Sequence, residues 1–154
     1  MAFPFFAVFL LLGTAPGSTP ETQSLEFRDF FVASPRELKP SPRLLGLAGQ
    51  RVRLVGYMAL MEEPPKGAFY LLCAFPVEAT ESGGGTADLP PEAVLVVVPS
   101  ARGRELAHIP RRLEAVGVLE VGPGADDDGR VSAIRLILDG PVAAATAASR
   151  SAQP

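Results

Sequence analysis

The stretch that decides the fold is Leu47-Ala48-Gly49-Gln50-Arg51-Val52-Arg53-Leu54-Val55-Gly56-Tyr57, because it opens a series of predicted strands that continues to Asp139. Between Arg51 and Met61 two sets of residues alternate along the chain. A period of two is typical of a half-buried strand. The face expected to meet the core carries Val52, Leu54, Gly56, Met58 and Leu60, and the opposite face carries Arg51, Arg53, Tyr57 and Ala59.

Four further strands are predicted downstream. The segment from Ala68 to Phe75 alternates in the same way after a Pro-rich turn, and should pair with the first strand as a hairpin. An unbroken apolar run over residues 93–98 indicates a strand buried on both faces. The fourth and fifth strands are expected from Arg111 to Val121 and from Arg130 to Leu138, with one short helix around residues 104–109 before them.

Five strands with an irregular excursion between the third and fourth match an oligonucleotide/oligosaccharide-binding (OB) barrel. Gly56 and Gly117 lie inside strands, where a small barrel needs sharp bends or bulges. An immunoglobulin-like sandwich would require about seven strands. The predicted fold class is therefore mainly β, a five-stranded OB-like small barrel.

The two ends of the chain are expected to lie outside this barrel, which we place at residues 47–140. Residues 3–12 are almost wholly apolar and precede small residues that suit a signal peptidase, so residues 1–23 are predicted to be an export segment. That run is too short to span a membrane as a helix. Residues 24–46 form a lead-in whose Phe27, Phe30 and Phe31 should cover an open end of the core, and residues 141–154 a flexible tail.

Composition excludes several classes of function. The chain of 154 residues has a net charge of −3, which disfavours nucleic acid as a partner because a phosphate-binding face needs surplus Lys and Arg. Its single cysteine, Cys73, cannot form an intramolecular disulfide, and no thiolate cluster is present to hold zinc. We therefore expect no cofactor and no metal, and a fold stabilised by packing.

A family resemblance rests on short Gly-based motifs. Leu47-x-Gly49-Gln50-Arg51-Val52-x-Leu54-x-Gly56-Tyr57-Met58, Phe69-Tyr70-Leu71-Leu72, Val116-Gly117-x-Leu119-x-Val121-Gly122 and Asp128-Gly129-x-Val131-Ser132 resemble a bacterial exported and lipoprotein family known only as a domain of unknown function. The resemblance covers residues 44–138. It implies an envelope protein with a small barrel, sometimes suspected of accompanying transporters or of metal handling. Members often carry a second Cys or a His beside the cysteine that Cys73 matches, and that partner is absent here.

The sequence offers one candidate binding patch and one candidate thiol site. If the first, fourth and fifth strands are neighbours, their outward side chains would form a positive patch, unless Glu114 and Glu120 neutralise it as cross-strand pairs. Cys73 alternates with apolar residues, which is typical of an inert buried thiol. His108 has the pattern of a solvated loop residue and residues 126–128 that of an acidic turn. The predicted patch consists of Arg51, Arg53, Tyr57, Arg111, Arg112 and Arg135.

These features favour a non-enzymatic binding or accessory protein of the bacterial envelope, periplasmic or secreted, acting through an outward strand face or the loop over residues 83–91. Its expected partner is an envelope protein or a small anionic ligand, and the mature chain should not span the membrane. The alternative is a metal-handling or thiol-active periplasmic protein centred on Cys73. An acid/base hydrolase is less favoured, because no paired carboxylates or nucleophile motif stand out.

Overall fold

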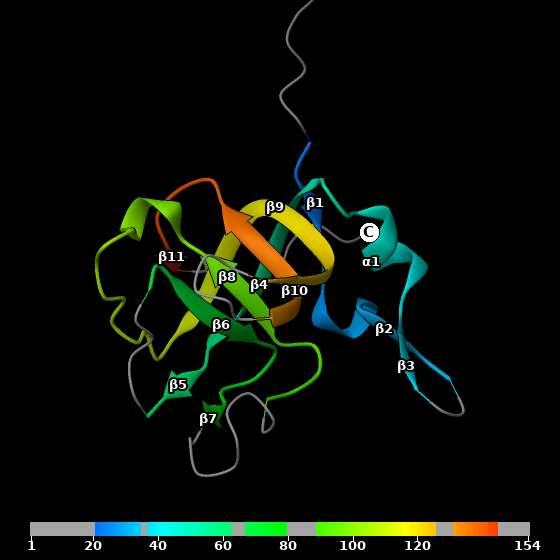
Figure 1. Ribbon diagram of the computed structural model, residues 1–154, viewed down its shortest axis with the longest axis horizontal. Helices are drawn as coiled ribbons and strands as arrows, with labels where there is room; N and C mark the ends of the chain where they lie inside the picture. The colour runs from blue at the N-terminus through cyan, green and yellow to red at the C-terminus, as the bar shows by residue number, and fades with distance from the viewer. Residues whose placement is uncertain (1–20, 35–36, 63–66, 80–88, 126–130, 145–154) are drawn as a thin grey trace, which may run out of the picture.

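The computed structural model describes residues 21–34, 37–62, 67–79, 89–125 and 131–144, and the fold is mainly β. Its five principal strands follow the predicted order along the chain, as Figure 1 shows. They are β4 (Arg51–Met58), β6 (Phe69–Cys73), β8 (Val94–Val97), β9 (Arg112–Ala125) and β10 (Val131–Leu138).

These strands pair in a closed circuit. β4 pairs antiparallel with β6, β6 antiparallel with β8, and β8 parallel with β10. β10 then pairs antiparallel with β9, and β9 returns antiparallel to β4. The 14 residues of β9 allow this, because its first part pairs with β4 and its later part with β10. The predicted hairpin between the first two strands is confirmed.

Short elements surround the circuit. β1 (Gln23–Ser24) pairs parallel with β4, and β11 (Ala143–Ala144) pairs antiparallel with β9. β2 (Phe31–Ala33) and β3 (Leu38–Pro40) form a separate hairpin, and β5 (Leu60–Met61) pairs parallel with β7 (Glu78–Ala79). The helical elements are α1 (Pro42–Gly46) and the 3-10 turns η1 (Phe27–Asp29) and η4 (Pro99–Ala101).

The main core fills the circuit and follows the predicted period. In β4 every second residue from Val52 to Met58 is buried. Gly56 and Gly117 are required by close approach, since a Cβ at Gly56 would meet the carbonyl oxygen of Cys73 and the ring of Phe27. A Cβ at Gly117 would meet the backbone of Ile137. A glycine at each position therefore lets neighbouring chain segments pack directly on the strand.

The lead-in is part of the same core. Leu25, Phe30 and Leu44 are buried within it, and Phe27 and Phe31 pack against it partly buried, as predicted. Ser41 caps α1, because its hydroxyl accepts a hydrogen bond from the Leu44 amide at 3.0 Å. Figure 1 places α1, β2 and β3 together on one side of the strands.

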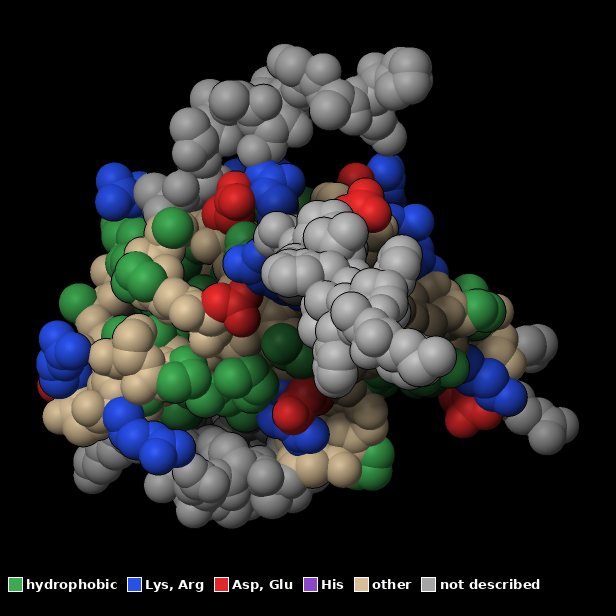
Figure 2. All heavy atoms as spheres, turned by 90° about the horizontal axis from the view of Figure 1, so that it is seen from above, with side chains coloured by type: hydrophobic (Ala, Val, Ile, Leu, Met, Phe, Trp, Pro, Cys, Tyr) green, Lys and Arg blue, Asp and Glu red, His purple; other side chains and the backbone are tan. Residues whose placement is uncertain are grey.

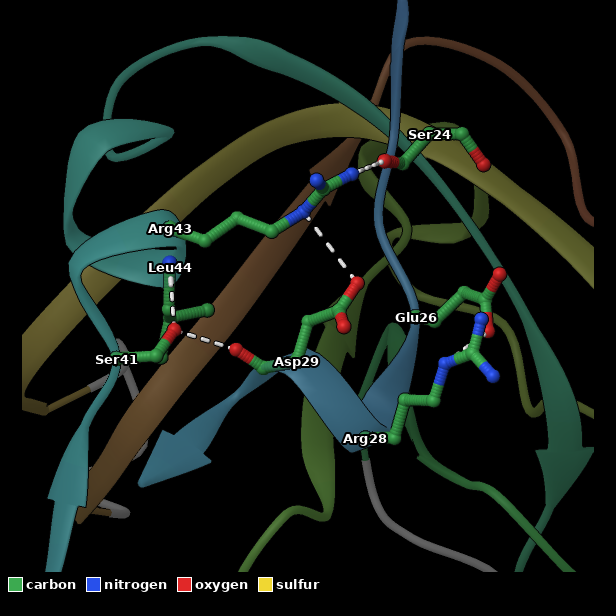
Figure 3. A network of polar contacts seen from close by, with 7 residues as sticks. All are labelled: Ser24, Glu26, Arg28, Asp29, Ser41, Arg43 and Leu44. Carbon is green, nitrogen blue, oxygen red and sulfur yellow. Dashed lines mark hydrogen bonds and ion pairs between the residues drawn. The ribbon is translucent and has the colours of Figure 1, made fainter.

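Polar contacts hold the lead-in in this position, as Figure 3 shows. The buried Ser41 hydroxyl donates to the carbonyl oxygen of Asp29. Arg43 donates to the carbonyl oxygen of Ser24 at 2.9 Å and lies 3.3 Å from the Asp29 carboxylate. These contacts tie β1, η1 and α1 to one another, so the lead-in docks as one unit.

A second, smaller apolar cluster covers the outer face of β6 and β8. Because β6 is buried on both faces, Tyr70 and Leu72 point into the main core while Phe69, Leu71 and Cys73 point into this cluster. Its other members come from β8 and from the segments beside the sheet: Ala59, Leu95, Met61, Val77, Leu89 and Ala93.

The predicted helix around residues 104–109 is wrong. The β8–β9 connection has only the 3-10 turn η4, and residues 105–110 have no regular secondary structure. Gly103 follows η4 with φ of 77°, in the left-handed region that ends a helical turn. Pro110 then disfavours a helical conformation at Ile109. The segment between them runs without helical structure over the main core, where Leu106 and Ile109 are packed.

Two strand ends and the start of the tail also differ from expectation. β4 ends at Met58, Ala59 turns into the second cluster, and Leu60 is exposed in β5 instead of facing the core. Phe75 lies beyond the end of β6 and is 72% exposed. The predicted tail, residues 141–154, begins later than expected, because Val142 packs against the main core and β11 pairs with β9.

Some predictions fall on residues outside the described ranges. They are residues 1–20 of the export segment, residues 83–88 of the candidate binding loop, the acidic turn at 126–128, and residues 145–154 of the tail. In the ranges that the structure describes, none of the helices has the length and apolar character needed to cross a membrane.

Candidate functional site

The predicted patch residues lie on neighbouring strands, except for Arg111, which lies in a bend directly before β9. Arg51, Arg53 and Tyr57 alternate with the buried residues of β4, so they face outward. Arg112 opens β9 directly opposite Tyr57, and Arg135 lies on β10 opposite Glu120. The structure therefore brings the strands together as expected, and the charge on this outer face depends on how each arginine is paired.

Three of the arginines are engaged by carboxylates. Arg51 lies 2.6 Å from Asp139, Arg53 lies 2.8 Å from Glu114, and Arg135 lies 2.8 Å from Glu120. The hydrogen bond between Arg53 and Glu114 holds the pKa of the Glu114 carboxyl below its ordinary value, and it raises the pKa of the Arg53 guanidinium. Glu114 and Glu120 thus neutralise part of the predicted patch through cross-strand pairs.

Arg111 and Arg112 differ from these three. Both are exposed, and among the described residues neither has an ion pair or a hydrogen-bonded side-chain partner. Tyr57 is half-buried beside Arg112 in the strand register. His108 reaches the same end of β4, where its Nε2 donates a hydrogen bond to the carbonyl oxygen of Met58 at 3.2 Å. The uncompensated cationic part of the patch is therefore the start of β9.

The surface extends into the β8–β9 connection, which sequence reasoning missed. Arg102 and Arg104 are exposed there, and Arg104 donates to the carbonyl oxygen of Ser100 at 3.0 Å. A sequence signal was present, since residues 102–112 carry four arginines and one glutamate in a chain of net charge −3. We call residues 102–112 the basic connection. Figure 2 shows Lys and Arg side chains along the left margin, the side where Figure 1 draws this segment.

Apolar side chains fix the orientation of the basic connection. Ala101 is buried in the main core just before it, and Leu106 and Ile109 pack against that core partly buried. The residues between these anchors, Glu105, Ala107 and His108, are exposed. The connection therefore runs over the core with its charged side chains turned to solvent.

Cys73 has the surroundings of an inert thiol. It is fully buried in the second cluster, and burial together with the nearby charge of Glu92 raises the pKa of Cys73 to about 11. A thiol needs to become a thiolate to act as a nucleophile or metal ligand. These surroundings oppose a thiol-active role. In the described part of the chain, no three His, Cys, Asp or Glu residues are grouped so that they could hold a metal.

Comparison with known proteins gives a likeness of fold. A crystal structure of a DUF3299 family protein from Pseudomonas aeruginosa matches 82% of this chain and 97% of that chain, with a TM-score of 0.50 and 13% sequence identity. The two proteins share a fold. The expected likeness to a family of unknown function is thus supported at the level of the fold. No protein-family model and no curated protein matches the sequence.

Proposed function

We propose that the chain is a non-enzymatic binding module of the bacterial envelope, built on an OB-like barrel and exported to the periplasm or beyond. The order of the five paired strands and the parallel pair between the third and fifth support the barrel assignment. The apolar run and small residues near the N-terminus support export.

The common ligand surface of OB barrels is not the surface we propose for binding. Such barrels bind oligonucleotides and oligosaccharides on the outer face of their second and third strands. Here those strands are β6 and β8, whose outer residues Phe69, Leu71 and Leu95 are buried under the second cluster. Binding is therefore assigned to the other side of the circuit, where β4 meets β9.

The observation that carries the proposal is the contrast between paired and unpaired arginines. Arg51, Arg53 and Arg135 are charge-compensated, whereas Arg111 and Arg112 are exposed without an ion pair in the described chain. Uncompensated guanidinium groups favour an anionic partner, because each can form charge-assisted hydrogen bonds with carboxylates or phosphates. The partner class is an envelope protein with an acidic surface.

The test is partner capture in the cells that produce the protein. The full-length, C-terminally tagged chain is cross-linked to its partners and recovered, and its intact mass is measured. An Arg112→Glu variant and a Lys39→Glu control are treated in the same way. Lys39 is exposed on β3, in the lead-in, and undergoes the same change of charge. We expect one specific partner that Arg112→Glu loses and Lys39→Glu retains, with a mass showing removal of the N-terminal segment. Equal capture by both variants would reject the site, and an uncleaved chain would reject export.

A further inference from the structure

Residues 105–110 of the basic connection differ from its two ends, because their backbone is not paired with the rest of the described chain. Within the described chain, no hydrogen bond joins the backbone groups of residues 105–110 to any other residue. The segment lies at the surface, with Glu105, Ala107, His108 and Pro110 exposed. Solvent-facing backbone donors and acceptors that lack partners are available to a second polypeptide strand.

Exposed arginines flank this unpaired segment at both ends. Arg104 precedes it, and Arg111 and Arg112 follow it, all three exposed. A strand rises about 3.3 Å per residue, so cations seven residues apart would lie roughly 23 Å from each other along an extended segment. A partner complementary to the unpaired backbone and its flanking arginines would be extended and would carry acidic side chains at both ends.

We infer that the basic connection docks an extended acidic polypeptide segment, which pairs with the backbone of residues 105–109 while its carboxylates meet Arg104, Arg111 and Arg112. A polypeptide fits better than a glycan or nucleic acid, because only a peptide backbone offers regularly alternating donors and acceptors. This inference rests on the proposed binding role and names the class of its partner. It does not depend on export.

The apolar anchors make this segment suitable for docking. Leu106 and Ile109 hold the connection against the main core, so its backbone is positioned before a partner arrives. A positioned segment loses less conformational entropy on binding than a free loop would. The arginines at both ends of the connection would fix the register of the incoming segment, because an alignment that moves its carboxylates away from these arginines is disfavoured.

The experiment is a fluorescence titration with a defined probe. The labelled peptide Glu-Glu-Thr-Val-Thr-Val-Thr-Glu-Glu is compared with a version in which glutamine replaces every glutamate. It is also compared with a version N-methylated at alternate residues, which keeps the charge and removes backbone donors. Inorganic polyphosphate serves as a polyanion without a peptide backbone. The chain is tested unaltered, as Arg111→Glu with Arg112→Glu, as Arg104→Glu, and as the Lys39→Glu control.

We expect the unaltered chain to bind the acidic peptide saturably. The double variant should bind the acidic peptide about tenfold or more weakly, and the unaltered chain should bind the glutamine peptide more weakly by about the same factor. Lys39→Glu should bind the acidic peptide with unchanged affinity. N-methylation should weaken binding by a similar factor. Arg104→Glu gives an independent readout if the double variant fails to fold. Equal binding of the acidic and N-methylated peptides, tighter binding of polyphosphate, or no peptide binding would each overturn the inference.

Failure of this inference and failure of the binding role are distinguishable. If the peptide does not bind but Arg112→Glu still loses a partner in cells, the binding role stands and the peptide assignment falls. If capture in cells is also unaffected by Arg112→Glu, both fall together.

Discussion

Leu44 tests whether the lead-in belongs to the core or merely lies beside it. Its side chain is fully buried in the main core, although it comes from α1, before the first of the five principal strands. Truncating a buried leucine to alanine removes transfer free energy and leaves a cavity, which together cost about 2–5 kcal/mol. We expect Leu44→Ala to lower the free energy of unfolding by an amount in that range.

The neighbouring residue provides a matched control. Leu45 lies on the same helix but is 54% exposed, so Leu45→Ala should change stability by no more than about 0.5 kcal/mol. Urea unfolding followed by circular dichroism measures both variants. With a slope of about 1–3 kcal/mol per molar urea, the Leu44 midpoint should fall by roughly 1 M or more. Similar midpoints for the two variants would refute the view that the lead-in completes the core.

Three further predictions concern polar and ionisable groups. Burial and the charge of Glu92 raise the pKa of Cys73 to about 11. Its thiol should therefore react with a disulfide reagent at pH 8 only at the rate at which the protein unfolds locally or globally. Rapid labelling of the native protein would support the thiol-active alternative. The hydrogen bond from Arg53 lowers the pKa of Glu114, so the pair stabilises the fold above the unfolded pKa of about 4.3, and this stabilisation is lost as pH falls through the lower folded pKa. The Arg53–Glu114 coupling in a double-mutant cycle should therefore be about 0.2–1 kcal/mol at pH 7 and should decrease as the solution is acidified below about pH 4; coupling that does not decrease in acid would contradict the pairing. The hydroxyl of Tyr70 is buried with no hydrogen-bond partner among the described residues. Tyr70→Phe should therefore leave the free energy of unfolding in urea unchanged or raise it by up to about 1–3 kcal/mol. A clear decrease in this free energy would show that the hydroxyl has a partner.

The strands could be predicted because their signal is local. Alternation of apolar side chains identified the buried face of β4 from Val52 to Met58, and the apolar run over residues 93–98 identified β8. The helix expected at residues 104–109 does not form, and Leu106 and Ile109 pack against the main core from an irregular segment instead. Strand ends were less predictable, because Leu60 and Phe75 continue the alternation after β4 and β6 have ended.

The candidate site was predicted only in part. The strand neighbours that unite Arg53, Arg112 and Arg135 were anticipated from the expected topology, and so was neutralisation by Glu114 and Glu120. Which arginines stay unpaired was not readable from the chain, because Asp139 reaches Arg51 from a point 88 residues away in sequence.

The amino-acid order alone determined the strands, their inward faces and the buried character of Cys73, because each depends on the side chains of one short segment. Tertiary structure decided three other matters: the closure of the strands into a circuit, the incorporation of the lead-in into the core, and the exposure of Arg111 and Arg112 without an ion pair to any described residue. Each depends on contacts between segments far apart in the chain, whose pairing is set by packing of the whole molecule rather than by local periodicity.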